Sequence, residues 1–357
     1  MTNNTPLGVI EGFFGRSWSW QQRMELADFL RNNGFDYYLY APKNDRHLRS
    51  QWRQDWSRQD WQALCDLRQG YSDAGIEFGI GLSPLDLCSP EGRTDGASLD
   101  AKIRRINQLQ PDILALLFDD MRGDLPQLAA TQAELCHRVA ALTGAKKVIL
   151  CPTYYSDDPI LEKVFGDRPE GYWQSLGRLV DPAIDIFWTG PKVCTERYTR
   201  AHLSDVAERL QRRPTLWDNY PVNDGAVKSK HLYLKPFSDD RASLGDLLAG
   251  HAVNPMNQFN LSKLALASLP HAYTSASYQP DTLFNQLLER FCSPKLRQSL
   301  QNDAAVFAQL GLDGMSPEQR AQLSLRYRKL QEQNGMAAEV ADWLDGEYAF
   351  DPSCLTD

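Results

Sequence analysis

The chain has 357 residues, of which 42% are hydrophobic and 24% are charged. These fractions are typical of a folded globular protein and exclude disorder as a description of the whole chain. The formal net charge of −8 argues against a duplex nucleic acid held by phosphate attraction. No apolar run approaches the roughly 18 residues that a membrane span needs. We therefore expect neither a nucleic acid nor a membrane as a partner.

The seven cysteines are spread along the chain without a CxxC pair, and their number is odd. The first residues lack the basic segment and the long apolar segment of a secretory signal. Both observations predict reduced thiols and a cytoplasmic location. The six histidines are equally scattered, with no HxH or HxxxH pair, so we expect no metal site built on imidazole and no cofactor.

Eight short apolar segments, each followed by a helical pattern directly or after a loop, fill about the first 270 residues. Near-continuous apolar strands indicate burial on both faces, and therefore a parallel sheet beneath helices. Eight such units predict a (β/α)8 TIM barrel over residues 1–275 rather than an open doubly wound sheet. The eighth segment has the weakest pattern, because only Ala252 and Val253 are apolar. The predicted strands are Gly8–Phe14, Tyr37–Pro42, Phe78–Ser83, Ile113–Phe118, Val148–Tyr155, Ile184–Gly190, Pro214–Asn219 and His251–Pro255.

Apolar residues at helical spacing predict the helices between these strands, and Gly34 suits the position just after the first of them. The helical stretches lie around Met24–Leu30 and at Trp61–Tyr71, Leu99–Leu109, Leu128–Leu142, Tyr172–Leu179, Leu203–Leu210, Leu244–Leu248 and Leu261–Leu269. Beyond Pro280 the strand pattern stops. We expect a helical C-terminal module over residues 280–357, with helices at Leu283–Phe291, Leu296–Leu310, Pro317–Gln333 and Ala337–Leu344.

The active site of such a barrel lies at the C-terminal ends of its strands. The residues at those positions are mostly carboxylates, amides and aromatic rings. This set suits a sugar, whose hydroxyls need polar partners and whose ring face stacks on an aromatic side chain. The residues at the predicted strand ends are Glu11, Gly12, Phe14, Lys43, Asn44, Asp45, Asp119, Asp120, Tyr154, Tyr155, Trp188, Trp217, Asp218, Asn219 and Asn254.

Two adjacent acids, Asp119 and Asp120, follow the apolar segment ILALLF. Beyond a strand end the backbone turns, so both side chains can line one cavity. Two carboxylates so close cannot both ionise freely, and one of them should titrate high and could act as a general acid. In a simpler interpretation one Asp caps the following helix beside a solvated neighbour. In a third interpretation the pair binds a metal ion, but no third carboxylate shares a tight motif with it.

Seven motifs, in order from Leu7 to Leu269, resemble glycoside hydrolase family 84, the β-N-acetylglucosaminidases that include protein O-GlcNAcases and hyaluronidase-like enzymes. The motifs are GVIEGFFGRSW, YLYAPKND, ALLFDD, CPTYY, FWTGPKV, WDNYPVND and VNP. The resemblance implies a retaining exo-hydrolysis in which the substrate's own 2-acetamido oxygen attacks the anomeric carbon and closes an oxazoline. Substrate assistance of this kind is an exception to the usual scheme with two carboxylates.

The resemblance implies a role for each matching residue. Asp119 would orient the acetamido N–H, and Asp120 would protonate the leaving oxygen and later deprotonate water. Gly12 and Lys43 would contact sugar hydroxyls. The remaining implied binding residues are Tyr155 and Trp217 as walls of the acetamido pocket, Asn219 as a supporting amide, and Asp224 and Asn254 as partners of the outer hydroxyls. Without the motifs, a turn glycine, a solvated lysine, core aromatics and loop residues explain these positions; Asp218 is left unassigned between a salt bridge and a cap.

The chain departs from the family pattern at Phe14, where Tyr is usual, at Asn44, where the first Asp of Lys-Asp-Asp is usual, and at Tyr154, where Glu is usual. The loop after Asp224 also differs. The expected partner is an N-acetylglucosamine-containing glycan or a glycosylated protein, and a homodimer stays open. The alternatives are cleavage of hyaluronan or cell-wall fragments, a non-catalytic glycan-binding barrel, and an unrelated barrel enzyme that uses magnesium.

Overall fold

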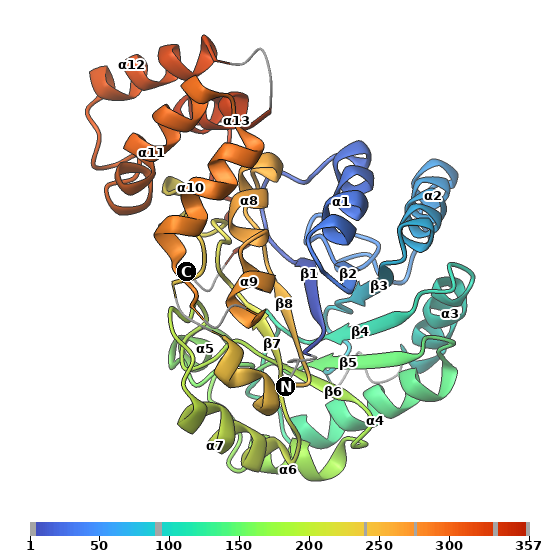
Figure 1. Cartoon of the computed structure of the whole chain (residues 1–357). Coiled ribbons are helices and arrows are strands. Elements are labelled where there is room, and N and C mark those ends of the chain that lie inside the picture. Colours follow the sequence, from blue (N-terminus) through green and yellow to red (C-terminus); the bar gives the residue numbers. More distant parts are fainter. Residues whose placement is uncertain (1–4, 90–94, 239–240, 275–276, 331–334, 355–357) are drawn as a thin grey trace.

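The structure is a computed structural model that describes residues 5–89, 95–238, 241–274, 277–330 and 335–354. Within these ranges eight parallel strands form one closed barrel in chain order, in which β1 pairs with both β2 and β8 (Figure 1). The (β/α)8 barrel predicted from the sequence is confirmed, including its eighth strand. The strands are β1 (Leu7–Glu11), β2 (Tyr37–Tyr40), β3 (Glu77–Leu82), β4 (Ile113–Leu117), β5 (Lys147–Cys151), β6 (Asp185–Trp188), β7 (Thr215–Asp218) and β8 (Gly250–Val253).

Most strands end earlier than their apolar segments predict. Strand β5 stops at Cys151 because the next residue, Pro152, has no N–H to donate to a sheet. Strand β1 stops at Glu11, where the Gly12 N–H turns back to the Ile10 carbonyl at 2.9 Å. Most residues predicted at strand ends therefore lie on the loops just beyond the strands.

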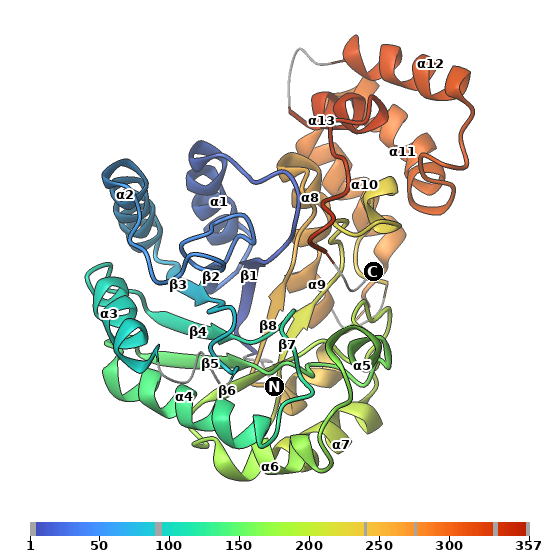
Figure 2. The ribbon, with the colours of Figure 1, turned by 180° about the vertical axis from the view of Figure 1, so that it is seen from behind.

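Helices surround the barrel (Figures 1 and 2). The first begins with a capping box formed by Ser19 and Gln22, and Gly34 follows its end with a φ of 76°, as predicted. The helices of the barrel are α1 (Trp20–Asn32), α2 (Arg58–Ala74), α3 (Gly96–Asn107), α4 (Leu128–Leu142), α5 (Ile160–Phe165), α6 (Tyr172–Leu179), α7 (Arg200–Leu210), α8 (Phe259–Leu266) and α9 (Leu269–Thr274).

Three helix predictions differ from the structure. Helix α5 was not expected from the sequence. The stretch Leu244–Leu248 was expected to be α-helical but forms a 3-10 helix over Ala242–Leu247, since it is short and contains Gly245. The stretch Leu261–Leu269 is divided into α8 and α9, because Pro270 cannot donate the hydrogen bond that would continue the first helix.

Four further helices follow the barrel: α10 (Pro280–Phe291), α11 (Pro294–Gln309), α12 (Pro317–Arg328) and α13 (Gly335–Leu344). Helix α12 ends at Arg328, earlier than the predicted Gln333, and residues 331–333 of that prediction lie outside the described residues. The carboxylate of Glu339 on α13 accepts hydrogen bonds from the backbone N–H groups of Asn260 and Leu261 at the start of α8. The Trp343 indole donates to the Ser229 carbonyl at 3.0 Å, in the long loop after β7. These bonds fix α13 against the barrel.

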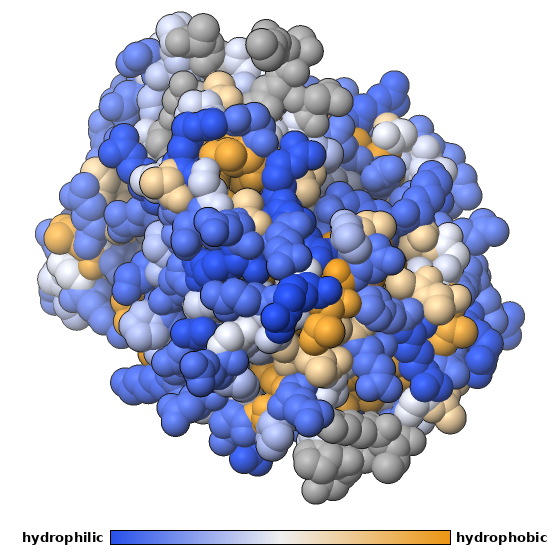
Figure 3. Space-filling model, turned by 90° about the horizontal axis from the view of Figure 1, so that it is seen from below, coloured by the Kyte–Doolittle hydropathy of each residue, from blue (hydrophilic) through white to orange (hydrophobic). Residues whose placement is uncertain are grey.

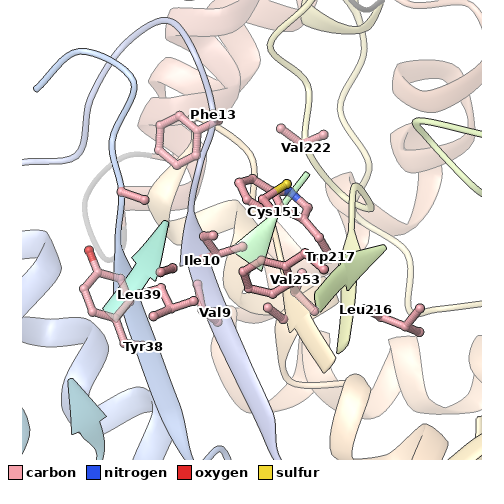
Figure 4. Packing of buried hydrophobic residues seen from close by; sticks show 14 of the residues in the cluster. Val9, Ile10, Phe13, Tyr38, Leu39, Cys151, Leu216, Trp217, Val222 and Val253 are labelled. Atoms are coloured by element: carbon pink, nitrogen blue, oxygen red, sulfur yellow. The ribbon is translucent and has the colours of Figure 1, made fainter. Parts of the chain in front are cut away.

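The hydrophobic core runs from the barrel into these helices as one cluster. Figure 4 shows part of it, with side chains of neighbouring strands packed together and Cys151 near Trp217. The face of the molecule in Figure 3 is mainly hydrophilic, with scattered hydrophobic residues. Among the described residues, no helix combines the length and the hydropathy needed to cross a bilayer.

A buried ion pair fixes the end of β1. The Glu11 carboxylate is fully buried and accepts hydrogen bonds from Arg23 Nε at 2.8 Å and Nη2 at 2.6 Å, and from the Tyr38 hydroxyl at 2.5 Å. Glu11 is therefore a structural residue rather than part of the site, and it anchors the loop that begins at Gly12.

Replacing Arg23 with Met is expected to lower the free energy of unfolding by about 3–5 kcal/mol, because the Glu11 charge would stay buried without its cation. Denaturant titration measures this loss. The double variant Arg23→Met with Glu11→Gln should recover part of the stability. A single variant as stable as the parent would contradict this account of β1.

Candidate active site

A cavity opens at the C-terminal ends of the strands. Every residue that the sequence singled out for catalysis or binding lines it. These residues come from the ends of six different strands or from the loops that follow them, so the closed barrel is what brings them together. They are Gly12, Lys43, Asp119, Asp120, Tyr155, Trp217, Asn219, Asp224 and Asn254.

The two acids share the cavity because the chain turns sharply between them. Asp119 and Asp120 follow β4, and Asp120 has a φ of 58°, in the left-handed region that Asp tolerates better than most residues. This turn keeps neighbouring side chains from pointing in opposite directions. The alternative in which one of them caps the next helix is wrong, since α4 begins only at Leu128, after Gln127.

The Lys43 ammonium bridges the two acids. Its Nζ donates to Asp119 Oδ2 and, at 3.1 Å, to Asp120 Oδ2, and the lysine side chain is only 3% exposed. Burial alone would lower the pKa of Lys43, but the two neighbouring carboxylates raise it well above its usual value. Lys43 is thus a buried cation rather than a solvated lysine.

The two carboxylates differ in their surroundings. Burial raises the pKa of Asp120, Lys43 opposes this effect, and the negative charge of Asp119 adds to it. The sequence predicted a raised pKa in this pair from mutual repulsion, but the larger cause is burial. Asp119 Oδ1 is buried and has no hydrogen-bond partner among the described residues. A ligand N–H placed there would satisfy it.

Arg49 is a residue of this region that the sequence analysis missed. Its guanidinium lies 3.8 Å from Asp120 Oδ2 and 5.1 Å from the centre of the Phe14 ring. The predicted motif YLYAPKND stops at Asp45, and no local pattern indicates that the chain returns toward the acids four residues later. A second cation therefore faces Asp120.

A chain of hydrogen bonds positions the opposite wall. The Asn219 carbonyl oxygen accepts from the Trp217 indole and from the Asn254 amide, both at 3.0 Å, and the Asn219 amide donates to the Val193 carbonyl. The Asn254 oxygen accepts from the Gly12 N–H at 3.2 Å. Asn219 therefore holds the Trp217 and Asn254 side chains in place on this wall of the cavity.

Gly12 is required by close packing rather than by a turn. A Cβ at this position would lie 2.5 Å from the Trp217 ring, which no real contact allows. The indole can therefore approach the backbone after β1 only because residue 12 lacks a side chain. Tyr155, which is buried, lines the same cavity.

Asp224 lies on the long loop after β7. Its Oδ2 accepts a hydrogen bond from the Phe14 N–H at 2.8 Å. Burial raises the pKa of Asp224 to about 6, the Phe14 N–H opposes this shift, and the negative charge of Asp120 adds to it. Asp224 is thus a partly buried carboxyl whose pKa is raised toward neutral pH.

The three departures from the family pattern have different surroundings. Phe14 lines the cavity, with Lys43 Nζ 5.5 Å from its ring centre. The Asn44 amide donates to the Gly15 carbonyl. The Tyr154 hydroxyl donates to the Gly166 carbonyl at 2.5 Å, away from the residues that line the cavity. Of these three single-residue departures, only Phe14 lines the cavity, and the loop after Asp224, which also differs from the family pattern, contributes Lys228 to the lining.

Asp218, which the sequence left unassigned, is structural. It is fully buried, and it accepts hydrogen bonds from Arg241 Nη1 at 2.9 Å and from the Tyr220 N–H at 3.1 Å.

Within the described ranges, no group of three or more His, Cys, Asp or Glu residues could hold a metal ion. In the acid pair, the Lys43 ammonium already bridges the two carboxylates. These residues therefore do not fit the magnesium alternative.

A pair of acids beside aromatic and amide groups, at the mouth of a (β/α)8 barrel, is typical of glycoside hydrolases. A beta-N-acetylglucosaminidase family model matches residues 7–308. The chain therefore belongs to this family, glycoside hydrolase family 84, as its motifs predicted. The match continues into α11, so the division into a barrel and a separate helical module stays a prediction.

Two curated relatives are named Protein O-GlcNAcase, from Rattus norvegicus and Mus musculus. Each is 30% identical over 278 residues, which cover 75% of this chain and 30% of the relative. The chain thus spans about a third of their length. Among solved structures, a Thermobaculum terrenum O-GlcNAc hydrolase mutant is 29% identical with a TM-score of 0.76, over 96% of this chain and 80% of that one. CpGH84B is 23% identical with a TM-score of 0.73, over 95% and 66%, and shows the fold alone.

The Asp224 carboxyl is expected to titrate near pH 6, so that it holds its proton at pH 5 and has lost it by pH 7. Carboxyl carbon shifts in a 13C NMR titration measure this, with the resonance assigned by Asp224→Asn. Asp246 serves as the control, because its hydrogen bond to Arg200 lowers its pKa. An Asp224 carboxyl that is fully ionised at pH 5 would contradict the burial argument.

Proposed function

We propose that the protein is a retaining exo-β-N-acetylglucosaminidase that removes N-acetylglucosamine by substrate-assisted catalysis. The observation that carries the proposal is the pair Asp119 and Asp120 in one cavity, bridged by Lys43, with one carboxylate oxygen of Asp119 lacking a partner among the described residues. The O-GlcNAcase names of the relatives support an O-GlcNAc-modified protein as substrate.

In the proposed first step, the acetamido oxygen of the substrate attacks the anomeric carbon and closes an oxazoline ring. The acetamido N–H donates to Asp119 Oδ1, and the negative charge of Asp119 stabilises the positive charge that develops on the ring. Asp120 gives its proton to the leaving oxygen as the glycosidic bond breaks. Its raised pKa keeps that proton available closer to neutral pH.

In the second step, Asp120 takes a proton from water, and the water oxygen attacks the anomeric carbon from the face that the leaving group vacated. The acetamido group re-forms, and two inversions give net retention. Lys43 and Arg49 both oppose the effect of burial on Asp120, but burial is the larger cause and leaves the pKa of Asp120 raised. This raised pKa supports a protonated Asp120 beside an ionised Asp119.

The binding residues divide the sugar between them. Tyr155 and Trp217 form the walls against the acetamido group, with Trp217 held by Asn219. Gly12, Lys43, Asp224 and Asn254 face sugar hydroxyls.

Since the seven cysteines remain thiols, we propose a reducing compartment such as the cytoplasm as the location.

The protein is expected to hydrolyse aryl N-acetyl-β-glucosaminides. Asp120→Asn should slow substrates with poor leaving groups by about 10²–10⁴-fold, because they need a proton, and activated aryl glycosides far less. Initial rates across a series of phenols of rising pKa measure this. The rate with poor leaving groups should also fall as pH rises through the raised pKa of Asp120, and the variant should lose that dependence.

The matched control is Asp119→Asn, which should slow all members of the series to a similar extent, since every substrate uses its acetamido group. An Asp120→Asn variant that slows good and poor leaving groups equally would overturn the role of Asp120 as the acid. A parent protein that hydrolyses no member of the series would overturn the proposed function.

A further inference from the structure

After α13, residues 345–354 return to the barrel. Figure 2 shows this segment descending from α13 toward the barrel. Tyr348 anchors it, because its side chain is only 8% exposed and packs in the hydrophobic core. The Arg16 guanidinium lies 5.0 Å from the centre of the Tyr348 ring. Arg16 belongs to the same loop as Phe14, so the segment is attached to a loop that forms the cavity.

Cys354, at the end of this segment, lines the catalytic cavity together with Phe14 and Asp224. Its Sγ lies 3.9 Å from Asp224 Oδ1, while Asp224 Oδ2 holds the Phe14 N–H. A tight turn presents the thiol, with the Cys354 N–H donating to the Asp351 carbonyl at 3.0 Å. The thiol is thus in contact with the carboxylate oxygen of Asp224 that does not bind the Phe14 N–H.

The segment is held to the barrel at its other end as well. Helix α13, which precedes it, is fixed by the bond from Trp343 to the Ser229 carbonyl, in the same long loop that carries Asp224. The Arg16 guanidinium also lies 3.9 Å from Asp342 on α13. One connected set of contacts therefore positions both the Asp224 carboxylate and the Cys354 thiol.

We propose that residues 345–354 complete the sugar pocket and that Cys354 is a specificity-determining residue. This inference rests on the proposed function, in which Asp224 binds the outer hydroxyls of the terminal sugar. A sulfur atom in contact with the Asp224 carboxylate leaves no room for a substituent on a hydroxyl bound there. The segment restricts the enzyme to unsubstituted terminal N-acetylglucosamine.

The test compares three aryl N-acetyl-β-glucosaminides: the parent compound and its 4-O-methyl and 6-O-methyl ethers. In Cys354→Ala, removal of the sulfur makes space of about the size of a methyl group. The ratio of kcat/KM for an ether to kcat/KM for the parent compound is expected to rise by about tenfold or more, which is the scale of discrimination that one methyl-sized misfit produces in a pocket. Cys354→Leu should lower kcat/KM for all three, mainly through KM.

Cys151→Ala is the matched control, since it removes a thiol from the same cavity but at the end of β5, near the acid pair. It should leave the selectivity ratios unchanged. If Cys354→Ala does not fold, Cys354→Ser is used for the same comparison, with a smaller rise expected.

Unchanged ratios for both ethers in the folded Cys354 variant, with the parent compound hydrolysed normally by the wild type, would overturn the role of Cys354 and leave the proposed function standing. Equal rises in the Cys151 and Cys354 variants would also overturn it, because the effect would then not be specific to the Asp224 side. A wild type that hydrolyses none of the three compounds would overturn the proposed function, and this inference with it.

Discussion

The site depends on one buried ammonium group between two adjacent carboxylates. Without Lys43, the cavity at the C-terminal end of the barrel would hold two acids whose charges repel each other and are poorly solvated. With it, one negative charge is balanced, and a single further proton makes the group neutral. The surroundings favour Asp120 for that proton, because burial raises its pKa. This charge arrangement therefore matches the roles that the proposed chemistry needs.

The rest of the cavity is built by close approaches that only particular residues allow. Gly12 lets the Trp217 indole contact the backbone after β1, and the Asn219 amide fixes that indole. The left-handed turn at Asp120 brings both acids to the same side. The Glu11–Arg23 pair holds the end of β1 beneath these groups. The polar residues of the site are thus positioned before any ligand arrives.

Much of this could be predicted from the sequence, because strand ends in a parallel barrel converge on one cavity and the motifs lie at those ends. What the sequence could not predict depends on contacts between distant segments. Arg49 lies on a loop, and Cys354 is the last described residue. No local sequence pattern indicates that either of them lies near the site. The importance of burial for Asp120 was also hidden, since neighbouring charges are visible in a sequence and solvent exclusion is not. Helix α5 was missed, and the 3-10 helix over Ala242–Leu247 was predicted as α-helical, because short segments carry a weak periodic signal.

The central claim is that the attacking atom belongs to the substrate. The most direct test measures kcat/KM for aryl glycosides whose 2-acetamido group carries zero, one, two or three fluorine atoms. Because fluorine withdraws electrons from the amide oxygen, the account predicts a steep fall in rate with each added fluorine. Rates that do not change along the series would show that the acetamido oxygen does not attack, and would contradict the account.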